Sequence, residues 1–489
     1  MTRGNLHFIC RRDIFWHTPT TLRIIRATAP HLEHSNINMT TYHARFTEGP
    51  VGRHVLSMAG TSALGLLAVF LVDILTLMYV SMLDDQSLLA AVGLGKTLMF
   101  INSAFSSGLV IGAGALLSER IGRHASRALS RLTSHMLIMA LVLAGMIVLL
   151  EALFTQSLAR WLGGDLAVYQ NARLYLWTVV PSSILIAATQ MCVQMLRAQG
   201  QVKRALVVLL TGAGTLAVAD PLFIFGFDMG LEGAAVSCLV SATAALILGL
   251  VWVKRHIGMS MQIHLRLLAL HTGRTLRVAL PAMLGNLAMP VGITYLMVVM
   301  AGVGSSALAG MAVVDRILQF GYCVFFALPG ALVPVIAQNL GAGRDDRVKA
   351  IVVFTRRCVV LYGMALWLCL ALAGPWIADH FHLVDAGRAL FMAFCQVGAG
   401  LWIVFGLDFV AQSMFLTMNR AWWVPVFGWV RGTLGTLPFV YVGVRFFGGS
   451  GAVIGMWTGN ALVALAAIVT ASVVSRRFFA RREQALHQH

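Results

Sequence analysis

The segment VFLVDILTLMYV, residues 69–80, places one acidic residue, Asp73, inside an apolar run that extends from Val55 to Leu83. A run of this length can cross the hydrocarbon core of a bilayer as a helix. A carboxylate near the centre of such a helix costs about 2.5–3.5 kcal/mol on insertion scales. We therefore expect Asp73 to have a partner, a water-filled cavity or a proton to hold, and to be the leading functional residue.

The composition places the whole chain among polytopic membrane proteins. Of its 489 residues, 58% are hydrophobic and 11% are charged, against about 25% charged in ordinary soluble domains. A net charge of +17 would indicate a nucleic-acid partner in a soluble protein. Here the basic residues lie in short loops between apolar runs, so we expect no nucleic acid. The seven cysteines have no CxxC spacing and predict neither a disulfide framework nor a zinc site.

Apolar runs and loop charges together predict twelve membrane-spanning helices. With the N-terminus in the cytoplasm, the inner loops and helix ends hold eighteen Lys or Arg, and the outer ones hold four. This asymmetry follows the positive-inside rule and would be lost with an odd number of spans. It predicts a multi-pass protein of a bacterial inner membrane with both termini in the cytoplasm. The predicted spans lie near 54–82, 88–117, 131–153, 168–195, 204–226, 231–253, 278–301, 307–339, 351–374, 389–417, 422–444 and 450–474.

The predicted fold class is an all-α polytopic membrane protein with twelve transmembrane helices in two six-helix bundles. Shifting the chain by 219 residues lays 88–122 over 307–341 without a gap. Because each half has an even number of spans, a pseudo-two-fold axis along the membrane normal relates them. That arrangement places a cavity between the bundles and favours a carrier. The predicted segments are a disordered N-terminal extension (1–50), an N-lobe (51–253), a cytoplasmic linker (254–277), a C-lobe (278–475) and a basic cytoplasmic tail (476–489).

Four acidic residues lie well inside the predicted spans, at depths from the middle of the membrane to its outer third. They are Asp73, Asp220, Asp315 and Asp408, and their common depth fits a cation pathway. Asp73 either exchanges a proton or stays permanently neutral in a hydrogen bond. Asp220 precedes Pro221, which has no N–H and therefore frees a backbone carbonyl beside the carboxylate. This dipeptide either builds a proton or cation site that faces a cavity or ends a helix near the outer surface.

Polar residues one or two helical turns from these acids are candidates for the lining of the cavity. Thr76 follows Asp73 on the same helical face. Asp315 is next to Arg316, so the alternative for it is a structural salt bridge. Lys96 either pairs with an acid or extends toward the outer surface. The candidate lining residues are Thr76, Asp315, Gln319, Tyr322, Asp408, Gln412 and Asn286.

The sequence lacks the signatures of enzymes and metal sites. No Walker loop, nucleophile elbow or HExxH motif is present, which argues against ATP-driven transport and hydrolysis. His380 and His382 lie near Asp379 and Asp385 but without the ligand spacing of a tetrahedral metal site. We therefore expect no enzyme activity, no metal and no cofactor.

Five short motifs follow one another along the chain, four in the first half and one in the second. They are LAAVGLG (89–95), LRAQGQ (196–201), DPLFIFG (220–226), GAA (233–235) and PVIAQNLGAG (334–343). In order and spacing they resemble the multidrug and toxic compound extrusion (MATE) family, and most closely its DinF-like branch. The resemblance implies twelve helices in two lobes around a V-shaped cavity. It also implies export of organic cations driven by the entry of protons or sodium. By position, Asp73 and Asp220 match the acids on helices 1 and 5 of the family's cation site.

The sequence departs from the family at three positions. Leu216 stands where the family often has Asn, Val69 where the DinF-like branch can have Tyr, and Thr61 where helix 1 has Pro. Pro281, the counterpart of that proline in the second half, is present. The loss of polar partners favours protons over sodium, because acids in an apolar setting hold protons readily.

These observations predict a secondary antiporter that exports organic, often cationic and lipophilic compounds in exchange for protons or sodium. We expect it to work in the bilayer as a monomer on a small-molecule substrate. One alternative is a lipid-linked precursor flippase. A flippase would favour a strongly basic cavity that binds pyrophosphate, but the predicted spans contain only three basic residues. Another is a non-transport membrane protein, which leaves the common depth of the four acids unexplained.

Overall fold

The computed structural model describes residues 44–83, 86–124, 129–161, 173–260 and 262–487, and the regular elements in this part are all helical. The first half comprises α2 (Val51–Ser81), α3 (Gln86–Gly122), α4 (Leu129–Trp161), α6 (Arg173–Ala198), α7 (Val202–Pro221), the π-helical turn η3 (Leu222–Gly226) and α8 (Gly230–His256). The second half comprises α9 (Leu265–Asn286), α10 (Met289–Val303), α11 (Ser305–Gly321), α12 (Cys323–Gly341), α13 (Asp345–His380), α14 (Asp385–Ala393), the π-helical turn η4 (Phe394–Gly398), α15 (Ala399–Thr417), α16 (Trp423–Gly432) and α17 (Leu437–His487).

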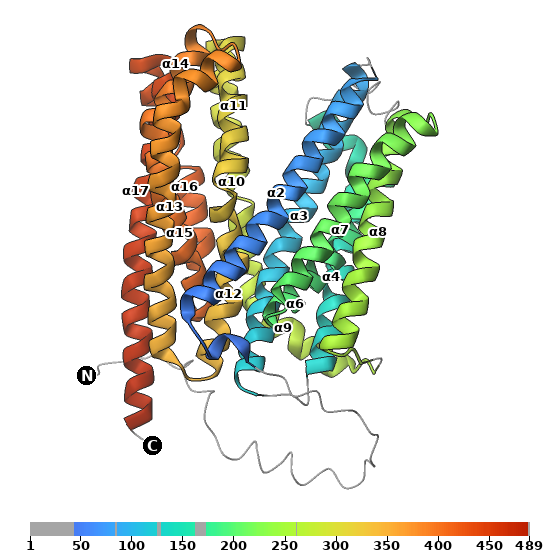
Figure 1. Ribbon diagram of the computed structural model, residues 1–489, viewed down its shortest axis with the longest axis vertical. Helices are drawn as coiled ribbons and strands as arrows, with labels where there is room; N and C mark the ends of the chain where they lie inside the picture. Colours follow the sequence, from blue (N-terminus) through green and yellow to red (C-terminus); the bar gives the residue numbers. More distant parts are fainter. Residues whose placement is uncertain (1–43, 84–85, 125–128, 162–172, 261, 488–489) are drawn as a thin grey trace, which may run out of the picture. The chain divides into compact units, whose positions relative to one another are not determined.

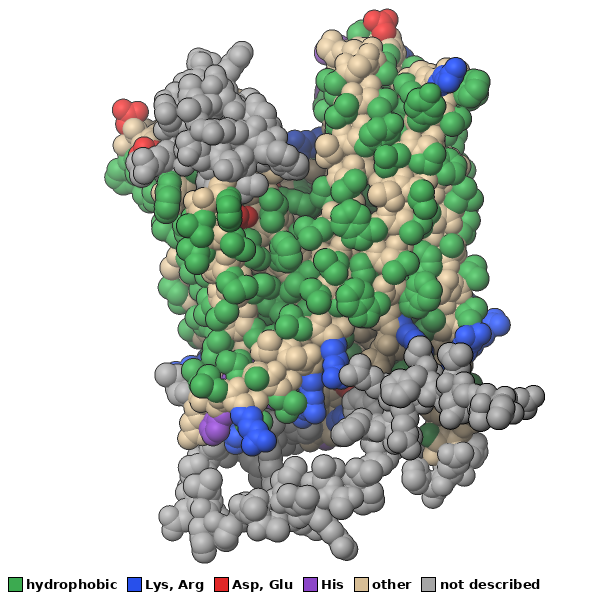
Figure 2. All heavy atoms as spheres, turned by 180° about the vertical axis from the view of Figure 1, so that it is seen from behind, with side chains coloured by type: hydrophobic (Ala, Val, Ile, Leu, Met, Phe, Trp, Pro, Cys, Tyr) green, Lys and Arg blue, Asp and Glu red, His purple; other side chains and the backbone are tan. Residues whose placement is uncertain are grey.

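These helices form two bundles that meet at one end and separate toward the other (Figure 1). The first bundle contains α2 to α8, and the second contains α10 to α17. Helix α9 lies along α3 of the first bundle, while α12 of the second bundle packs against both α2 and α3. We call the end where the bundles meet the closed end, and the other the open end. Figure 2 shows a notch between the bundles at the open end and a gathering of Lys and Arg side chains at the closed end.

The structure confirms the predicted number of crossings. Among the described residues, eleven helical stretches are long and apolar enough to cross a membrane. The last of them, Trp423–Ala485, has 63 residues, about twice the length that one crossing needs. Inside it the chain reverses at Gly448, which has a φ of 62° that favours glycine. The arms on either side of Gly448 are therefore two crossings, which makes twelve.

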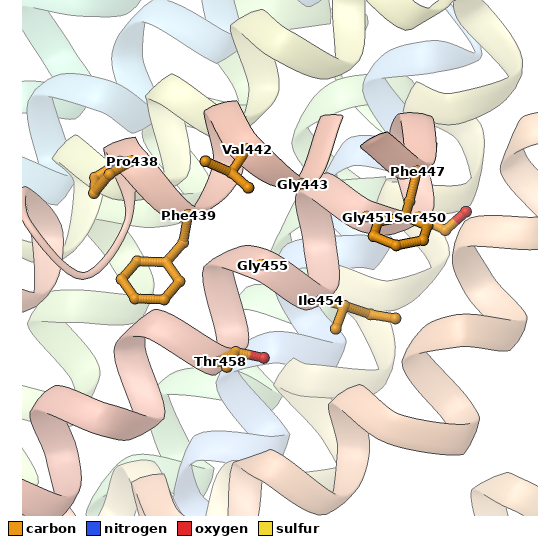
Figure 3. A pocket seen from close by; sticks show the side chains of 10 residues that line it. All are labelled: Pro438, Phe439, Val442, Gly443, Phe447, Ser450, Gly451, Ile454, Gly455 and Thr458. Atoms are coloured by element: carbon orange, nitrogen blue, oxygen red, sulfur yellow. The ribbon is translucent and has the colours of Figure 1, made fainter. Parts of the chain in front are cut away.

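The two arms of α17 pack so closely that their backbones touch. A Cβ atom added to Gly443 would lie 2.1 Å from the carbonyl oxygen of Gly451, and one added to Gly455 would lie 2.3 Å from that of Phe439. Small residues allow this approach, which is the usual basis of tight helix pairs in membranes. Beside the contact the arms leave an apolar pocket of about 740 Å³, lined by Phe439, Val442, Phe447 and Ile454 among others (Figure 3).

The closed end shows the predicted pseudo-two-fold relation directly. A Cβ atom on Gly122, at the end of α3, would lie 2.1 Å from the carbonyl oxygen of Gln338 in α12. A Cβ atom on Gly341 would lie 2.3 Å from the carbonyl oxygen of Glu119. The shift of 219 residues converts each of these contacts into the other. A contact that is reciprocal in this way is what a two-fold axis between the halves produces.

The structure adds detail to three of the predicted segments. Residues 1–43 lie outside the described residues, but Arg45–Thr47 form a 3₁₀ turn in which Phe46 is buried, so the expected disorder does not extend to residue 50. The predicted linker 254–277 is mostly helical, because α9 already begins at Leu265. The predicted tail is the helical end of α17, which continues to His487.

Candidate functional site

Asp220 lies at the end of α7, where the α-helix gives way to the π-helical turn η3. The α-helix ends at Pro221, and one π-helical turn continues the helical path to Gly226. The side chain of Asp220 is fully buried, and the hydroxyl of Thr76 in α2 donates a hydrogen bond to its Oδ2. Within the described residues, Oδ1 of Asp220 has no partner at bonding distance, although the Ser237 side chain on α8 lies near the carboxyl group. A buried carboxylate with a free oxygen is equipped to hold a proton.

Asp73 lies one turn before Thr76 on α2, and its side chain is exposed. It is close enough to Asp220, Lys96 and Arg316 to interact electrostatically with all three. Lys96 Nζ, from α3, donates to the main-chain oxygen of Asp73 at 3.4 Å. The structure therefore brings the two acids that were predicted to act together into one charged cluster, and Thr76 connects the helices that carry them.

The second half contributes Asp315 and Arg316, both on α11. Asp315 is half-buried and Arg316 is exposed. Consecutive helical residues point to different faces, and the described part of the chain contains no Asp315–Arg316 ion pair. Arg316 instead donates to the side-chain oxygen of Gln319 at 3.0 Å. The close ion pair considered from the sequence is therefore not formed, although the charge of Arg316 is near enough to act on both Asp315 and Asp73.

Asp408 was expected in the cavity, but it belongs to a buried ion pair inside the second bundle. Its Oδ2 accepts hydrogen bonds from Arg431 in α16 at 2.6 Å and from Gln412 at 2.8 Å. The Arg431 guanidinium also lies 5.6 Å from the centre of the Phe405 ring. The sequence did not predict this pair because it depends on how α15 and α16 rotate toward each other.

Tyr322 and Asn286 each form hydrogen bonds to another helix. Tyr322 is fully buried in the second bundle, where its hydroxyl donates to the main-chain oxygen of Ala399 at 2.8 Å. The amide of Asn286 donates to the main-chain oxygen of Ala104 and to Oγ of Ser107, at 3.1 and 2.8 Å. These bonds fix α9 against α3. Both residues therefore hold helices together.

One buried acid was missed by the sequence analysis. Glu151 on α4 is 4% exposed, and the amide of Asn102 on α3 donates to its Oε2 at 3.4 Å. The residue was passed over because it lies near the end of the predicted span 131–153. The helix runs on to Trp161, which moves Glu151 away from the end. Correct bounds for this helix would have revealed it.

The buried pair of Asp408 and Arg431 provides a test of stability. Arg431→Leu should lower the free energy of unfolding by about 3–5 kcal/mol, because it leaves a buried carboxylate without its partner. The double variant Asp408→Leu/Arg431→Leu should recover most of that loss. Thermal unfolding of the purified protein in detergent measures both. A double variant that is less stable than Arg431→Leu would contradict the assignment.

Comparison with known families gives a match over most of both halves. A family model described as MatE matches residues 62–222 and 281–428. An uncharacterized 21 kDa protein of Pseudomonas savastanoi is 36% identical over 253 residues, which are 50% of this chain and 80% of that protein. The multidrug export protein MepA of Staphylococcus aureus is 22% identical and covers 87% of this chain and 94% of its own.

Other relatives and solved structures agree with this match. An FAD transporter of Shewanella oneidensis is 24% identical, over 68% of this chain and 75% of that protein. The crystal structure of the Vibrio cholerae MATE transporter VcmN in the bent form has a TM-score of 0.82 at 20% identity, covering 88% of this chain and 98% of that one. An outward-facing multidrug resistance MATE transporter of the MOP superfamily has a TM-score of 0.80 at 21% identity, over 90% and 99%. At such identities the structures establish a common fold.

Proposed function

Because this chain belongs to the MatE family, we propose that it is a secondary active antiporter that exports small organic compounds, often cationic and lipophilic, in exchange for protons. The observation that carries the proposal is the buried carboxylate of Asp220, bound by Thr76 and clustered with Asp73. Ionisable groups inside membrane-spanning segments ordinarily mark ion pathways. Protonation of these acids removes the negative charge that attracts a cationic group, so proton and substrate compete for the site.

Protons are the proposed coupling ion, with sodium as the alternative. A hard cation needs several oxygen ligands around it. Asp220 accepts a hydrogen bond from Thr76. At two further positions the family can supply polar groups, but this chain has Val69 and Leu216 there, which have no side-chain oxygen. The names of two relatives, a multidrug exporter and an FAD transporter, support organic compounds as the cargo. Neither name describes an enzyme.

We further propose that the closed end faces the cytoplasm. The Lys and Arg side chains that gather there support this orientation (Figure 2), as does the excess of basic residues in the loops on that side. Both termini would then be cytoplasmic, in a bacterial inner membrane, and the notch would open to the outside. We propose a monomer of the DinF-like branch as the transporting unit.

Ion gradients imposed one at a time on proteoliposomes test the proposal. With only a pH gradient, we expect substrate to move against the protons and to stimulate proton flux. With only a sodium gradient at constant pH on both sides, we expect no transport above empty liposomes. Transport driven by sodium alone would reject proton coupling. Failure of both gradients to drive a compound that binds the purified protein would reject antiport.

A further inference from the structure

The short segment before α2, residues 44–49, is anchored in both bundles at the closed end. Ala44 is buried in the hydrophobic core of the first bundle. The side chain of Arg45 lies along the turn between α6 and α7, where a Cβ atom on Gly200 would lie 3.0 Å from its Cδ. Phe46 is 2% exposed and belongs to the hydrophobic cluster formed mainly by the second bundle. Neighbouring residues of one peptide are therefore buried in different bundles.

Polar contacts fasten the main chain of this segment to the second bundle. The N–H of Phe46 donates to Oε1 of Gln338 in α12 at 3.1 Å, and the side-chain amide of Asn339 donates to the Phe46 oxygen at 3.1 Å. Nη2 of Arg347 in α13 donates at 3.1, 3.3 and 3.0 Å to the main-chain oxygens of Phe46, Glu48 and Gly49. Hydrogen bonds from a charged donor are stronger than neutral ones, so Arg347 is the main polar attachment.

These contacts oppose separation of the bundles at the closed end. The segment continues through Pro50 directly into α2, so it stays with the first bundle when the two move apart. Opening then withdraws the Phe46 ring from the second bundle and breaks the bonds to α12 and α13. Gln338 also donates to the main-chain oxygen of Ala198 in α6, which ties the segment, α12 and α6 together through one side chain.

We propose that residues 44–49 form a latch that holds the closed end shut and must leave α12 and α13 before that end can open. Phe46 and Arg347 are its two holding residues. This inference goes beyond the proposed antiport, because it concerns the equilibrium between two openings and not the coupling ion or the substrate. A contact made in only one of two states shifts the equilibrium toward that state. Weakening the latch therefore populates the state in which the closed end is open.

Thiol labelling of a cysteine at position 115 tests the latch. Ala115 on α3 is buried within the same cluster as Phe46. It precedes Gly122 by seven residues, or about 10 Å along the helix, so it reports separation of the bundles rather than loss of the segment itself. A membrane-impermeant reagent is applied to the purified protein in detergent, after replacement of reactive native cysteines.

Phe46→Ala and Arg347→Gln should each raise the labelling rate about tenfold, the size expected for loss of a buried aromatic ring or of a hydrogen bond from a charged group. Arg357→Gln is the matched control, because Arg357 is an exposed arginine of the same helix, α13, and its removal should leave the rate unchanged. Labelling at the wild-type rate in both latch variants, with thermal stability retained, would overturn the proposal.

Hydrogen–deuterium exchange gives a second measurement that leaves the latch sequence intact, and it decides the matter if a latch variant is unstable. In wild type the amide of Phe46, bonded to Gln338, should exchange slowly. Gly122→Leu, which pushes α3 and α12 apart, should speed this exchange about tenfold or more, together with labelling at position 115. Continued protection of the Phe46 amide while position 115 reacts would show that the segment does not have to leave, which contradicts the latch. Neither measurement uses transport, so both outcomes are independent of the proposed antiport.

Discussion

Asp73→Asn is expected to abolish proton-driven export, by at least about a hundredfold, while the protein still inserts and folds. The amide has nearly the shape of the acid but cannot take up or release a proton. Because the Asp73 side chain is exposed, the change removes no buried packing. The measurement is substrate transport into proteoliposomes under a pH gradient, normalised to the amount of inserted protein and accompanied by thermal unfolding.

The control for this experiment is Asp346→Asn. Asp346 is a fully exposed acid at the start of α13, with a long contact of 3.9 Å to Lys349. Surface pairs of this kind contribute little, so its removal should leave both stability and transport unchanged. Export by Asp73→Asn at the wild-type rate would reject Asp73 as a coupling residue. Equal loss in both variants would show a general effect of charge.

Gly122→Leu is expected to reduce transport to the background level by preventing closure at the closed end. The added Cβ alone would lie 2.1 Å from the main-chain oxygen of Gln338, a separation that requires α3 and α12 to move apart. Gln338 cannot move freely, because it accepts a hydrogen bond from the Phe46 N–H at 3.1 Å and donates to the Ala198 oxygen at 2.5 Å. Gly341→Leu should have the same effect through Glu119, since the two contacts are reciprocal.

Accessibility of the closed end measures this effect. A cysteine at position 198, where Ala198 is fully buried, should resist a membrane-impermeant thiol reagent in the otherwise wild-type protein and react with it in Gly122→Leu. Native cysteines that react under these conditions are first replaced. Gly145→Leu is the matched control, because a Cβ atom at Gly145 meets no atom within 4 Å. Unchanged protection and transport in Gly122→Leu would contradict the proposed closing contact.

The sequence predicted the fold more completely than the site. Apolar runs and loop charges gave the number of crossings and the repeat of 219 residues, because the transfer of a segment into lipid depends mainly on its own residues. The partners of the four acids at a common depth could not be predicted in the same way. Asp220 joined Thr76, whereas Asp408 joined Arg431 in the other bundle. Sequence spacing along one helix does not predict a partner on another.

The sequence by itself determined that this chain spans a membrane with two related halves and that a few acids lie within the spans. Only the tertiary structure decided which of those acids share a site, that Lys96 and Arg316 from different bundles accompany Asp73, and that Gly122 and Gly341 close one end. The physical reason is that hydropathy adds up residue by residue along the chain. Pairing depends on how each helix rotates and crosses its neighbours, and those angles are set by packing across the whole molecule.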